Sequence, residues 1–233
     1  MKAFFNMKHI TDIFFDLDHT LWDFDANSVL AFDKIFKEQH PTLDTHQFVE
    51  VYAPINQACW KLYQVDKMKH EELRYQRLKQ SFDALHYEIS DEDIDKIAHD
   101  YIAFLPENNQ LFEGALEVLD YLASKYNLHI ITNGFAEVQY KKIANSGLEG
   151  YFKTVTNSEM AGVKKPHRNI FEFALSLAKV DKQNALMIGD CIDADVCGAI
   201  EFGMEAILFD EKNAHTATNF RTINHLTELK KIL

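Results

Sequence analysis

The stretch Asp12-Ile13-Phe14-Phe15-Asp16-Leu17-Asp18-His19-Thr20 places two carboxylates and a hydroxyl directly behind a short apolar run. The run predicts a buried strand that ends at Asp16. Because side chains of a strand alternate between its faces, we expect Asp16 and Asp18 on one side, about 6 to 7 Å apart. Two carboxylates that close repel each other unless a cation or a shared proton joins them. The stretch therefore indicates either a metal or acid–base site or, more simply, a strand that runs into an acidic turn.

Composition limits the class of protein. The 233 residues, of which 47% are apolar, can bury one large core, or one core and a smaller domain. A formal charge of −12 argues against binding to nucleic acid polymers or anionic membrane surfaces. The three cysteines, Cys59, Cys191 and Cys197, lack the spacing of zinc ligands, and we expect reduced thiols. No apolar stretch has the length of a signal peptide or a membrane span, so the sequence predicts a cytoplasmic protein.

The chain changes character at Gly114, since all eight glycines lie at or after this residue. From Asp25 to Leu105, apolar residues recur at helical spacing. Breaks in this pattern at 40–41, near Pro54, at 90–91 and at 105–106 predict roughly four helices.

Beyond Gly114, short apolar runs alternate with amphipathic stretches. This alternation predicts an α/β fold: a Rossmann-like parallel sheet with helices on both faces. The expected strands are 128–132, 185–189 and 206–209, and the expected helices are near 115–125, 136–145, 169–178 and 194–202.

The first strand stands apart from the other predicted strands, yet a strand is not stable alone and should join their sheet. The predicted core is therefore 1–21 with 107–233, and 22–106 form an inserted α-helical cap. An insertion at the carboxyl end of a strand is expected over the crevice where open α/β sheets bind ligands, so we expect it to act as a lid.

Three more candidate sites follow predicted strands. Thr132-Asn133-Gly134 offers a hydroxyl and turn-compatible amides for an anion, although Asn-Gly is also an ordinary turn. Lys165 precedes a proline that would restrict its backbone, although lysines are usually solvated. Asp190 and Asp195 follow the most apolar strand, where acidic groups are costly unless a cation or hydrogen bonds hold them.

Together these residues resemble the haloacid dehalogenase superfamily of phosphotransferases. Its four motifs are Asp-x-Asp-x-Thr, a Ser or Thr, a Lys before Pro, and Gly-Asp-x-x-x-x-Asp, and all four are present in order. The resemblance covers the whole chain, including an inserted helical cap of the C1 type. The segment Thr20–Ser28 is similar to the branch that contains house-cleaning pyrimidine 5′-nucleotidases.

The resemblance implies a Mg²⁺-dependent phosphatase of small phosphate monoesters that forms an aspartyl-phosphate, with a nucleoside 5′-monophosphate as the expected substrate. Asp16 is the expected nucleophile, and Asp18 is the general acid for the leaving alcohol and then the base for water. Mg²⁺ is expected on Asp16, Asp190 and the backbone carbonyl of Asp18.

The remaining residues of the set are expected to bind phosphate or to support the site. Thr132, Asn133, Gly134 and Lys165 are the expected phosphate-binding group, and Lys165 also offsets the charge on Asp16. Asp195 is expected to orient Asp190 or metal-bound water. Thr20 is expected to support the turn by a hydrogen bond.

Several alternatives stay open at this point. Asp18 favours a phosphatase over a 2-haloacid dehalogenase, because a halide leaves without a proton and an alkoxide does not. Phosphoglycolate or a sugar phosphate is the alternative substrate, and a mutase is a further alternative. A non-catalytic binding module is expected to lack Asp16, Asp18 or Asp190. The sequence leaves open a role for His19 or Cys191, and a monomer or a homodimer.

Overall fold

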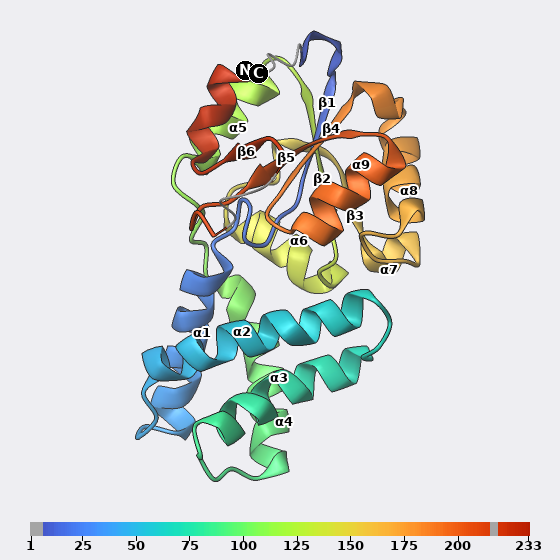
Figure 1. Ribbon diagram of the computed structural model, residues 1–233. Coiled ribbons are helices and arrows are strands. Elements are labelled where there is room, and N and C mark those ends of the chain that lie inside the picture. Colours follow the sequence, from blue (N-terminus) through green and yellow to red (C-terminus); the bar gives the residue numbers. More distant parts are fainter. Residues whose placement is uncertain (1–6, 215–218) are drawn as a thin grey trace. The chain divides into compact units, whose positions relative to one another are not determined.

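A parallel sheet organises one part of the chain in this computed structural model, which describes residues 7–214 and 219–233. The six strands found among these residues follow the order β3-β2-β1-β4-β5-β6 (Figure 1). The first strand thus pairs with β2 on one side and β4 on the other. The strands are β1 Asp12–Phe15, β2 Asn127–Thr132, β3 Phe152–Asn157, β4 Ala185–Gly189, β5 Glu205–Phe209 and β6 Thr222–Ile223.

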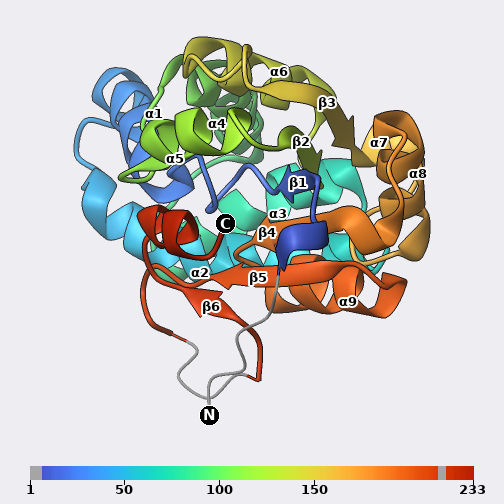
Figure 2. The same cartoon turned by 90° about the horizontal axis from the view of Figure 1, so that it is seen from above.

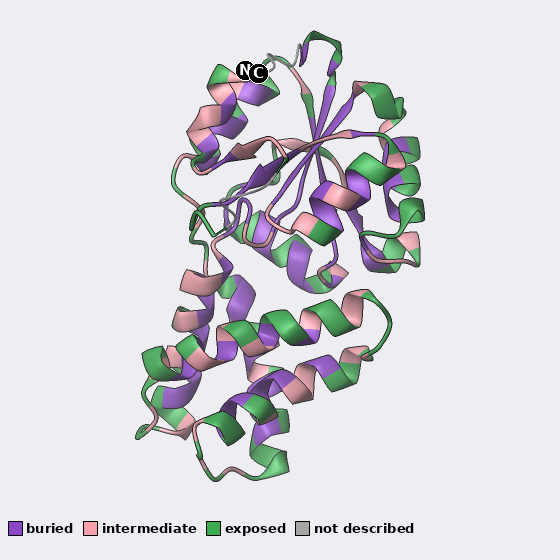
Figure 3. Ribbon diagram, viewed as in Figure 1, coloured by how far each residue is buried: buried purple, intermediate pink, exposed green. Residues whose placement is uncertain are grey.

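The central strands are apolar because helices cover both faces of the sheet. Every residue of β1 and β4 is buried (Figure 3). The predictions for β1, β2, β4 and β5 are confirmed, whereas the sequence pattern missed the edge strands β3 and β6. The reason is visible in Phe152–Asn157, which is only partly buried and mostly polar, because an edge strand has a neighbour on one side only.

Helices pack on both faces of the sheet, as the α/β prediction requires. Figure 2 shows α8 and α9 on one side of the strands and α5 and α6 on the other. Phe14, Ile131 and Met187 of the sheet pack with Phe171 and Ala199 in one buried cluster. The elements outside the helical insertion are η1 Met7–His9, α5 Ala115–Ala123, α6 Ala136–Asn145, α7 Ser158–Ala161, α8 Arg168–Ala178, η3 Lys182–Asn184, the π-helical turn Ile192–Cys197, α9 Gly198–Phe202 and η5 Leu226–Lys231.

The chain forms two compact units, 1–23 with 111–233 and 24–110. The second unit is helical and has an aromatic core, in which the Phe32 ring stacks on Tyr101 at 4.4 Å and meets Phe48 edge-on at 4.9 Å. Such ring pairs stabilise a core beyond the area that they bury. Its helices are α1 Phe24–Gln39, α2 Thr45–Gln64, α3 His70–Ala84, α4 Asp91–Phe104 and the short η2 Leu105–Glu107.

The expectation of four main helices is confirmed, but the predicted break at Pro54 is wrong. Helix α2 continues through Pro54 and ends ten residues later, at Gln64. Proline removes one helical hydrogen bond, and here its side chain is exposed, so water can satisfy the carbonyl that loses its partner. The buried residues Tyr52, Asn56 and Cys59 hold the two halves of α2 against the rest of the unit.

In the described part of the chain, every helix is too short or too polar to cross a lipid bilayer.

Candidate active site

The residues singled out in the sequence meet at the carboxyl edge of the sheet. Asp16 directly follows β1, and its amide donates to the carbonyl of Ile188 in β4 at 2.9 Å. Thr132 is the last residue of β2, and Asp190 is the first residue after β4. Because β1, β2 and β4 are parallel neighbours, their ends lie side by side. In open α/β sheets, ligands bind at the carboxyl edge where the strand order reverses, here beside β1.

Lys165 lies at the centre of this group and is almost completely buried. Its ammonium donates to Asp16 Oδ1 at 2.5 Å and to the Ile131 carbonyl at 2.7 Å, and it pairs with Asp195 Oδ1 at 2.6 Å. Two of the three hydrogens of the ammonium are thus used in hydrogen bonds, while the contact with Asp195 Oδ1 is an ion pair without a hydrogen bond among the described residues. The positive charge of Lys165 therefore lies against two carboxylates, Asp16 and also Asp195, which the sequence had not paired with it.

The Asn133 side chain holds the backbone of Lys165. Asn133 Nδ2 donates to the Lys165 carbonyl at 3.0 Å, and the Lys165 amide donates to Asn133 Oδ1 at 2.7 Å. Two such bonds align the loop that carries the lysine with the end of β2. The sequence predicted turn-compatible backbone amides here for phosphate; the side chain of Asn133 is used to place Lys165, and phosphate binding by its backbone amide stays a prediction.

Gly134 also differs from the prediction that it binds phosphate. Its amide donates to Thr132 Oγ1 at 3.1 Å, so it is not directed at an anion. A Cβ at this position would lie 2.4 Å from the amide group of Gln139. Gly134 is thus required for the close approach of the Gln139 side chain, which donates to the same Thr132 oxygen at 2.7 Å. An oxygen that accepts both bonds still carries its own hydrogen to donate.

Three carboxylates converge beside Lys165. Asp16, Asp190 and Asp195 each offer an oxygen within 4.8 Å of the others. Asp195 lies on the π-helical turn, and its Oδ2 accepts the Cys191 amide at 3.0 Å. A Cβ on residue 189 would lie 2.3 Å from this Oδ2, so only Gly189 leaves room for the carboxylate.

The charges of this cluster do not balance. Three carboxylates and one ammonium carry two net negative charges when all are ionised. Burial, assisted by Asp195, raises the pKa of Asp16 to about 7 although Lys165 opposes the shift. Burial and the neighbouring carboxylates likewise raise the pKa of Asp190 well above its usual value. At Lys165, the attraction of Asp16 and Asp195 exceeds the effect of burial and raises the ammonium pKa.

A divalent cation fits this arrangement. It would supply the two missing positive charges, and carboxylate oxygens are the ligands that Mg²⁺ prefers. The carboxylates of Asp16 and Asp190 are among those that could hold the ion. Thr20 Oγ1 donates to Asp190 Oδ1 at 3.4 Å, so Thr20 orients this carboxylate rather than only supporting its own turn.

Asp18 has a different set of partners from Asp16. The strand ends at Phe15, and the amides of Leu21 and Trp22 fold back onto the Leu17 carbonyl at 3.0 and 2.9 Å. The turn thus lies beyond Asp18, and the charge of Asp18 still acts on Asp16, where it adds to the raised pKa; that the two carboxylates share one side stays a prediction. The Asp18 carboxylate pairs with Lys142 at 2.5 Å and accepts from Gln139 Nε2 at 2.9 Å.

Sequence reasoning missed Gln139 and Lys142, which both lie on α6 and are buried. The available signal was weak: α6 has a narrow apolar face, with Val138 and Ile143 as its buried apolar residues. A helix of this kind must use some polar side chains to cover the sheet edge. The sequence does not tell which ones, because exposed lysines and glutamines have the same spacing.

Two residues left open by the sequence can be placed. His19 has a φ of 59°, a left-handed conformation that histidine adopts more readily than most non-glycine residues. Burial raises the pKa of the Cys191 thiol to about 12, and the neighbouring Asp195 adds to the shift. A raised pKa favours the neutral thiol, which is a weaker nucleophile than the thiolate.

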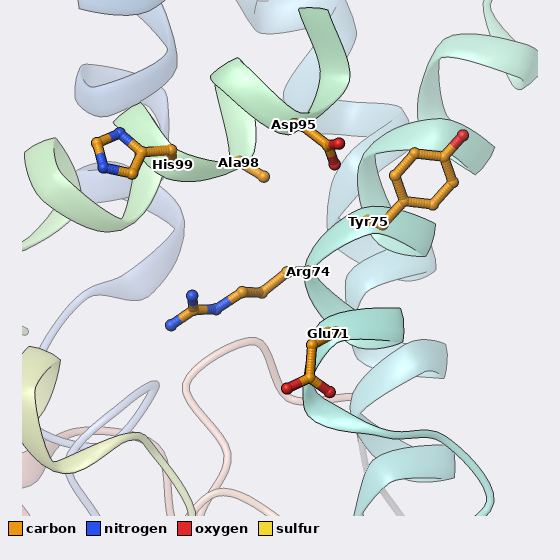
Figure 4. A pocket seen from close by; sticks show the side chains of 6 residues that line it. All are labelled: Glu71, Arg74, Tyr75, Asp95, Ala98 and His99. Carbon is orange, nitrogen blue, oxygen red and sulfur yellow. The ribbon is translucent and has the colours of Figure 1, made fainter. Parts of the chain in front are cut away.

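The helical unit has a pocket of its own between α3 and α4. Figure 4 shows Arg74 extending between Glu71 and His99, with Asp95 on the opposite helix. Both signs of charge line this pocket, so its chemistry does not favour one class of ligand, and we assign it none. The sequence motifs all lie in the other unit.

Comparison with known proteins agrees with this geometry. The pyrimidine 5′-nucleotidase PynA of Streptococcus pneumoniae is 33% identical over 88% of this chain and 86% of its own length. The pyrimidine 5′-nucleotidase YjjG of Escherichia coli is 28% identical over 95% and 96%, respectively. A crystal structure of the HAD-hydrolase YfnB of Bacillus subtilis, bound to magnesium, has a TM-score of 0.86 and 30% identity, over 97% of this chain and 99% of that chain.

The sequence pattern of the haloacid dehalogenase-like hydrolases matches residues 12–203, which include the whole set from Asp16 to Asp195. The motif residues that the pattern spans are those that meet at the carboxyl edge of the sheet, around Lys165. By its sequence, its fold and this arrangement, the chain belongs to the haloacid dehalogenase-like hydrolases.

Proposed function

We propose that this protein is a Mg²⁺-dependent phosphatase that hydrolyses small phosphate monoesters through an aspartyl-phosphate, with nucleoside 5′-monophosphates as its substrates. The observation that carries the proposal is that the two motif carboxylates have different partners. Asp16 lies in the buried acidic cluster beside Lys165, and Asp18 pairs with Lys142 of α6. A nucleophile and a proton carrier need such different surroundings.

Each residue takes one part in the reaction. A carboxylate oxygen of Asp16 bonds to phosphorus as the ester P–O bond breaks, and the leaving oxygen takes a proton from Asp18. Asp18, now ionised, removes a proton from the water that attacks the aspartyl-phosphate. This second step releases inorganic phosphate and restores Asp16. Splitting the hydrolysis in this way replaces one very slow displacement by two faster ones.

The phosphate is held by the hydroxyl of Thr132, the backbone amide of Asn133 and the charge of Lys165. Asp16, Asp190 and the Asp18 carbonyl would hold Mg²⁺, whose charge would add to the neutralisation of the phosphoryl group. The Asp195 carboxylate contributes by fixing Lys165 and the loop at Cys191.

The nucleotide assignment is supported by PynA and YjjG, both named as pyrimidine 5′-nucleotidases. We assign the choice among phosphate esters to the inserted helical unit. The presence of Asp18 opposes a haloacid dehalogenase, since a departing halide needs no proton. A non-catalytic module is opposed by the intact set of Asp16, Asp18 and Asp190.

A phosphate-release assay tests the proposal. Purified protein with Mg²⁺ is given pyrimidine and purine nucleoside 5′-monophosphates, phosphoglycolate and sugar phosphates. We expect turnover that requires Mg²⁺, is fastest with nucleotides and disappears in Asp16→Asn. Faster turnover of phosphoglycolate or a sugar phosphate would replace the nucleotide assignment, and release from none of the esters would overturn the phosphatase.

Asp193→Asn is a matched control for Asp16→Asn, because Asp193 is an exposed carboxylate outside the acidic cluster. It should retain wild-type turnover. Mass spectrometry of acid-quenched enzyme should detect a phosphoryl group on Asp16 in the wild type and in Asp193→Asn. Turnover without such an intermediate would argue for direct attack by water.

A further inference from the structure

Two side chains of α6 hold the Asp18 carboxylate on its two oxygens. Lys142 Nζ lies 2.5 Å from Oδ1, and Gln139 Nε2 lies 2.9 Å from Oδ2. Both residues are about 98–99% buried, whereas the Asp18 side chain keeps 23% of its surface accessible. The Asp18 carboxyl group is thus held by α6, and part of its surface remains accessible to solvent.

Gln139 links Asp18 to the predicted phosphate-binding hydroxyl. The same Nε2 that donates to Asp18 also donates to Thr132 Oγ1, at 2.7 Å. The Gln139 amide can approach this closely because residue 134 is a glycine. The Gln139 amide therefore fixes the distance between Asp18, which is proposed to transfer the proton, and Thr132, which is proposed to bind phosphate.

Lys142 is itself held in place. Its ammonium lies 4.2 Å from the centroid of the Trp22 ring, on a face that attracts cations. The ring is completely buried, and its Nε1 donates to Ser146 Oγ at 3.1 Å. Ser146 ends the same helix that carries Lys142, so Trp22 and α6 form one rigid support for the ammonium. A surface lysine that pairs with a carboxylate has no such support and contributes little.

We propose that Lys142 and Gln139 are positioning residues, which hold the Asp18 carboxyl group where it can deliver a proton to the leaving oxygen. The inference rests on the proposed phosphatase and names further residues of its mechanism. Lys142 contributes a charged anchor, and Gln139 sets the distance to Thr132. Precise placement of a reacting group increases the rate of the chemical step by a large factor, and a small displacement of the group removes much of this gain.

The leaving group provides the test. An alkyl phosphate such as a nucleoside 5′-monophosphate must receive a proton on its leaving oxygen, whereas p-nitrophenolate is a stable anion that leaves without one. Lys142→Met should therefore lower kcat/KM for the nucleotide about 10- to 100-fold, part of the usual contribution of a general acid. For p-nitrophenyl phosphate, kcat/KM should fall by less than about 3-fold, because this constant reports the first phosphoryl transfer.

The variants form a graded set. Lys142→Arg retains a cation and should recover most of the nucleotide activity. Gln139→Met should also lower nucleotide turnover, but it should be less selective than Lys142→Met, because Gln139 bonds to the Thr132 hydroxyl as well. The matched control is Lys141→Met, because Lys141 is an exposed lysine of the same helix. It should leave both constants unchanged.

A double-mutant cycle separates positioning from general damage. In an Asp18→Asn background, Lys142→Met should have little further effect on the nucleotide, because the group that it positions is gone. An equal loss on both esters, additivity with Asp18→Asn, or no loss on the nucleotide would each overturn the inference while leaving the phosphatase intact. Hydrolysis of neither ester by the wild type would overturn the phosphatase, and the inference with it.

Discussion

Asp16→Asn should stabilise the metal-free protein while abolishing its turnover. The pKa of Asp16 rises from 3.8 to about 7 in the folded protein, mainly through burial. The unfolded chain has no such shift. The folded protein therefore binds the Asp16 proton more tightly than the unfolded chain does. The stabilisation from this proton is fully present below about pH 4 and is lost as the pH rises through about 7. Because asparagine cannot ionise, the stability of Asp16→Asn does not fall in this way as the pH rises.

The size of the effect follows from the shift. The pKa changes by roughly three units, each worth about 1.4 kcal/mol, so ionised Asp16 costs about 4 kcal/mol above pH 7. Because Asn keeps an oxygen for Lys165 but loses the charge that attracts it, we expect a net gain of about 2 to 4 kcal/mol at pH 8. Near pH 4, where Asp16 is neutral in the folded protein and only about half ionised in the unfolded chain, the gain should fall below about 1 kcal/mol.

Urea unfolding in EDTA, at pH values from 4 to 8, measures this difference. Added Mg²⁺ should reduce it, because the wild type gains about 2.7 kcal/mol at a concentration of 100 times Kd and the variant binds the ion less well. The exposed carboxylate of Asp193 supplies the control, since Asp193→Asn should change stability by less than about 0.5 kcal/mol. A less stable Asp16→Asn at pH 8 in EDTA, or a difference that does not depend on pH, would refute the reasoning.

Three further substitutions test separate parts of the structure. Gly189→Ala forces the Asp195 carboxylate away, since the new Cβ would lie 2.3 Å from Oδ2. It should cost about 1–3 kcal/mol and weaken Mg²⁺ binding at least about 10-fold in calorimetry, and wild-type affinity would contradict the assignment. Arg77→Met removes a buried guanidinium that bonds to Asn56 but whose Nε and Nη2 lack acceptors among the described residues. Stability to urea should stay unchanged or rise by about 1–3 kcal/mol, and a loss of that size would show that the charge is well satisfied. Lys179→Gly relieves a φ of 58° at the end of α8 and should raise stability by about 0.5–1 kcal/mol, seen as a higher Tm; a lower Tm would show that the lysine side chain contributes more than the strain costs.

The buried strands could be predicted because burial on both faces leaves a plain sequence signal. Ile13-Phe14-Phe15 and Ala185–Gly189 are continuous apolar runs, and both are strands of the sheet centre. Phe152–Asn157 has no such run because it lies at an edge. In the helical unit, Pro54 suggested a break, but packing of its buried neighbours maintains α2 through that position.

The acidic cluster could also be anticipated, whereas the surroundings of Asp18 could not. Asp16, Asp190 and Asp195 follow buried strands, where carboxylates are too costly to be incidental. Gln139 and Lys142 lie on a helix whose other polar residues include exposed ones, such as Lys141. Their burial depends on how α6 packs against the turn after β1, over a hundred residues away in sequence.

The order of apolar runs along the chain was enough to predict which residues gather at one edge, because neighbouring parallel strands of a sheet bring their carboxyl ends together. Apolar runs locate the strands, and the residues after them must then be neighbours. Which ammonium pairs with which carboxylate depends on the packing of the folded chain. Lys165 joins Asp16 to Asp195, and Lys142 takes Asp18, because an ion pair depends on distances of a few ångströms between side chains that strand order alone does not specify.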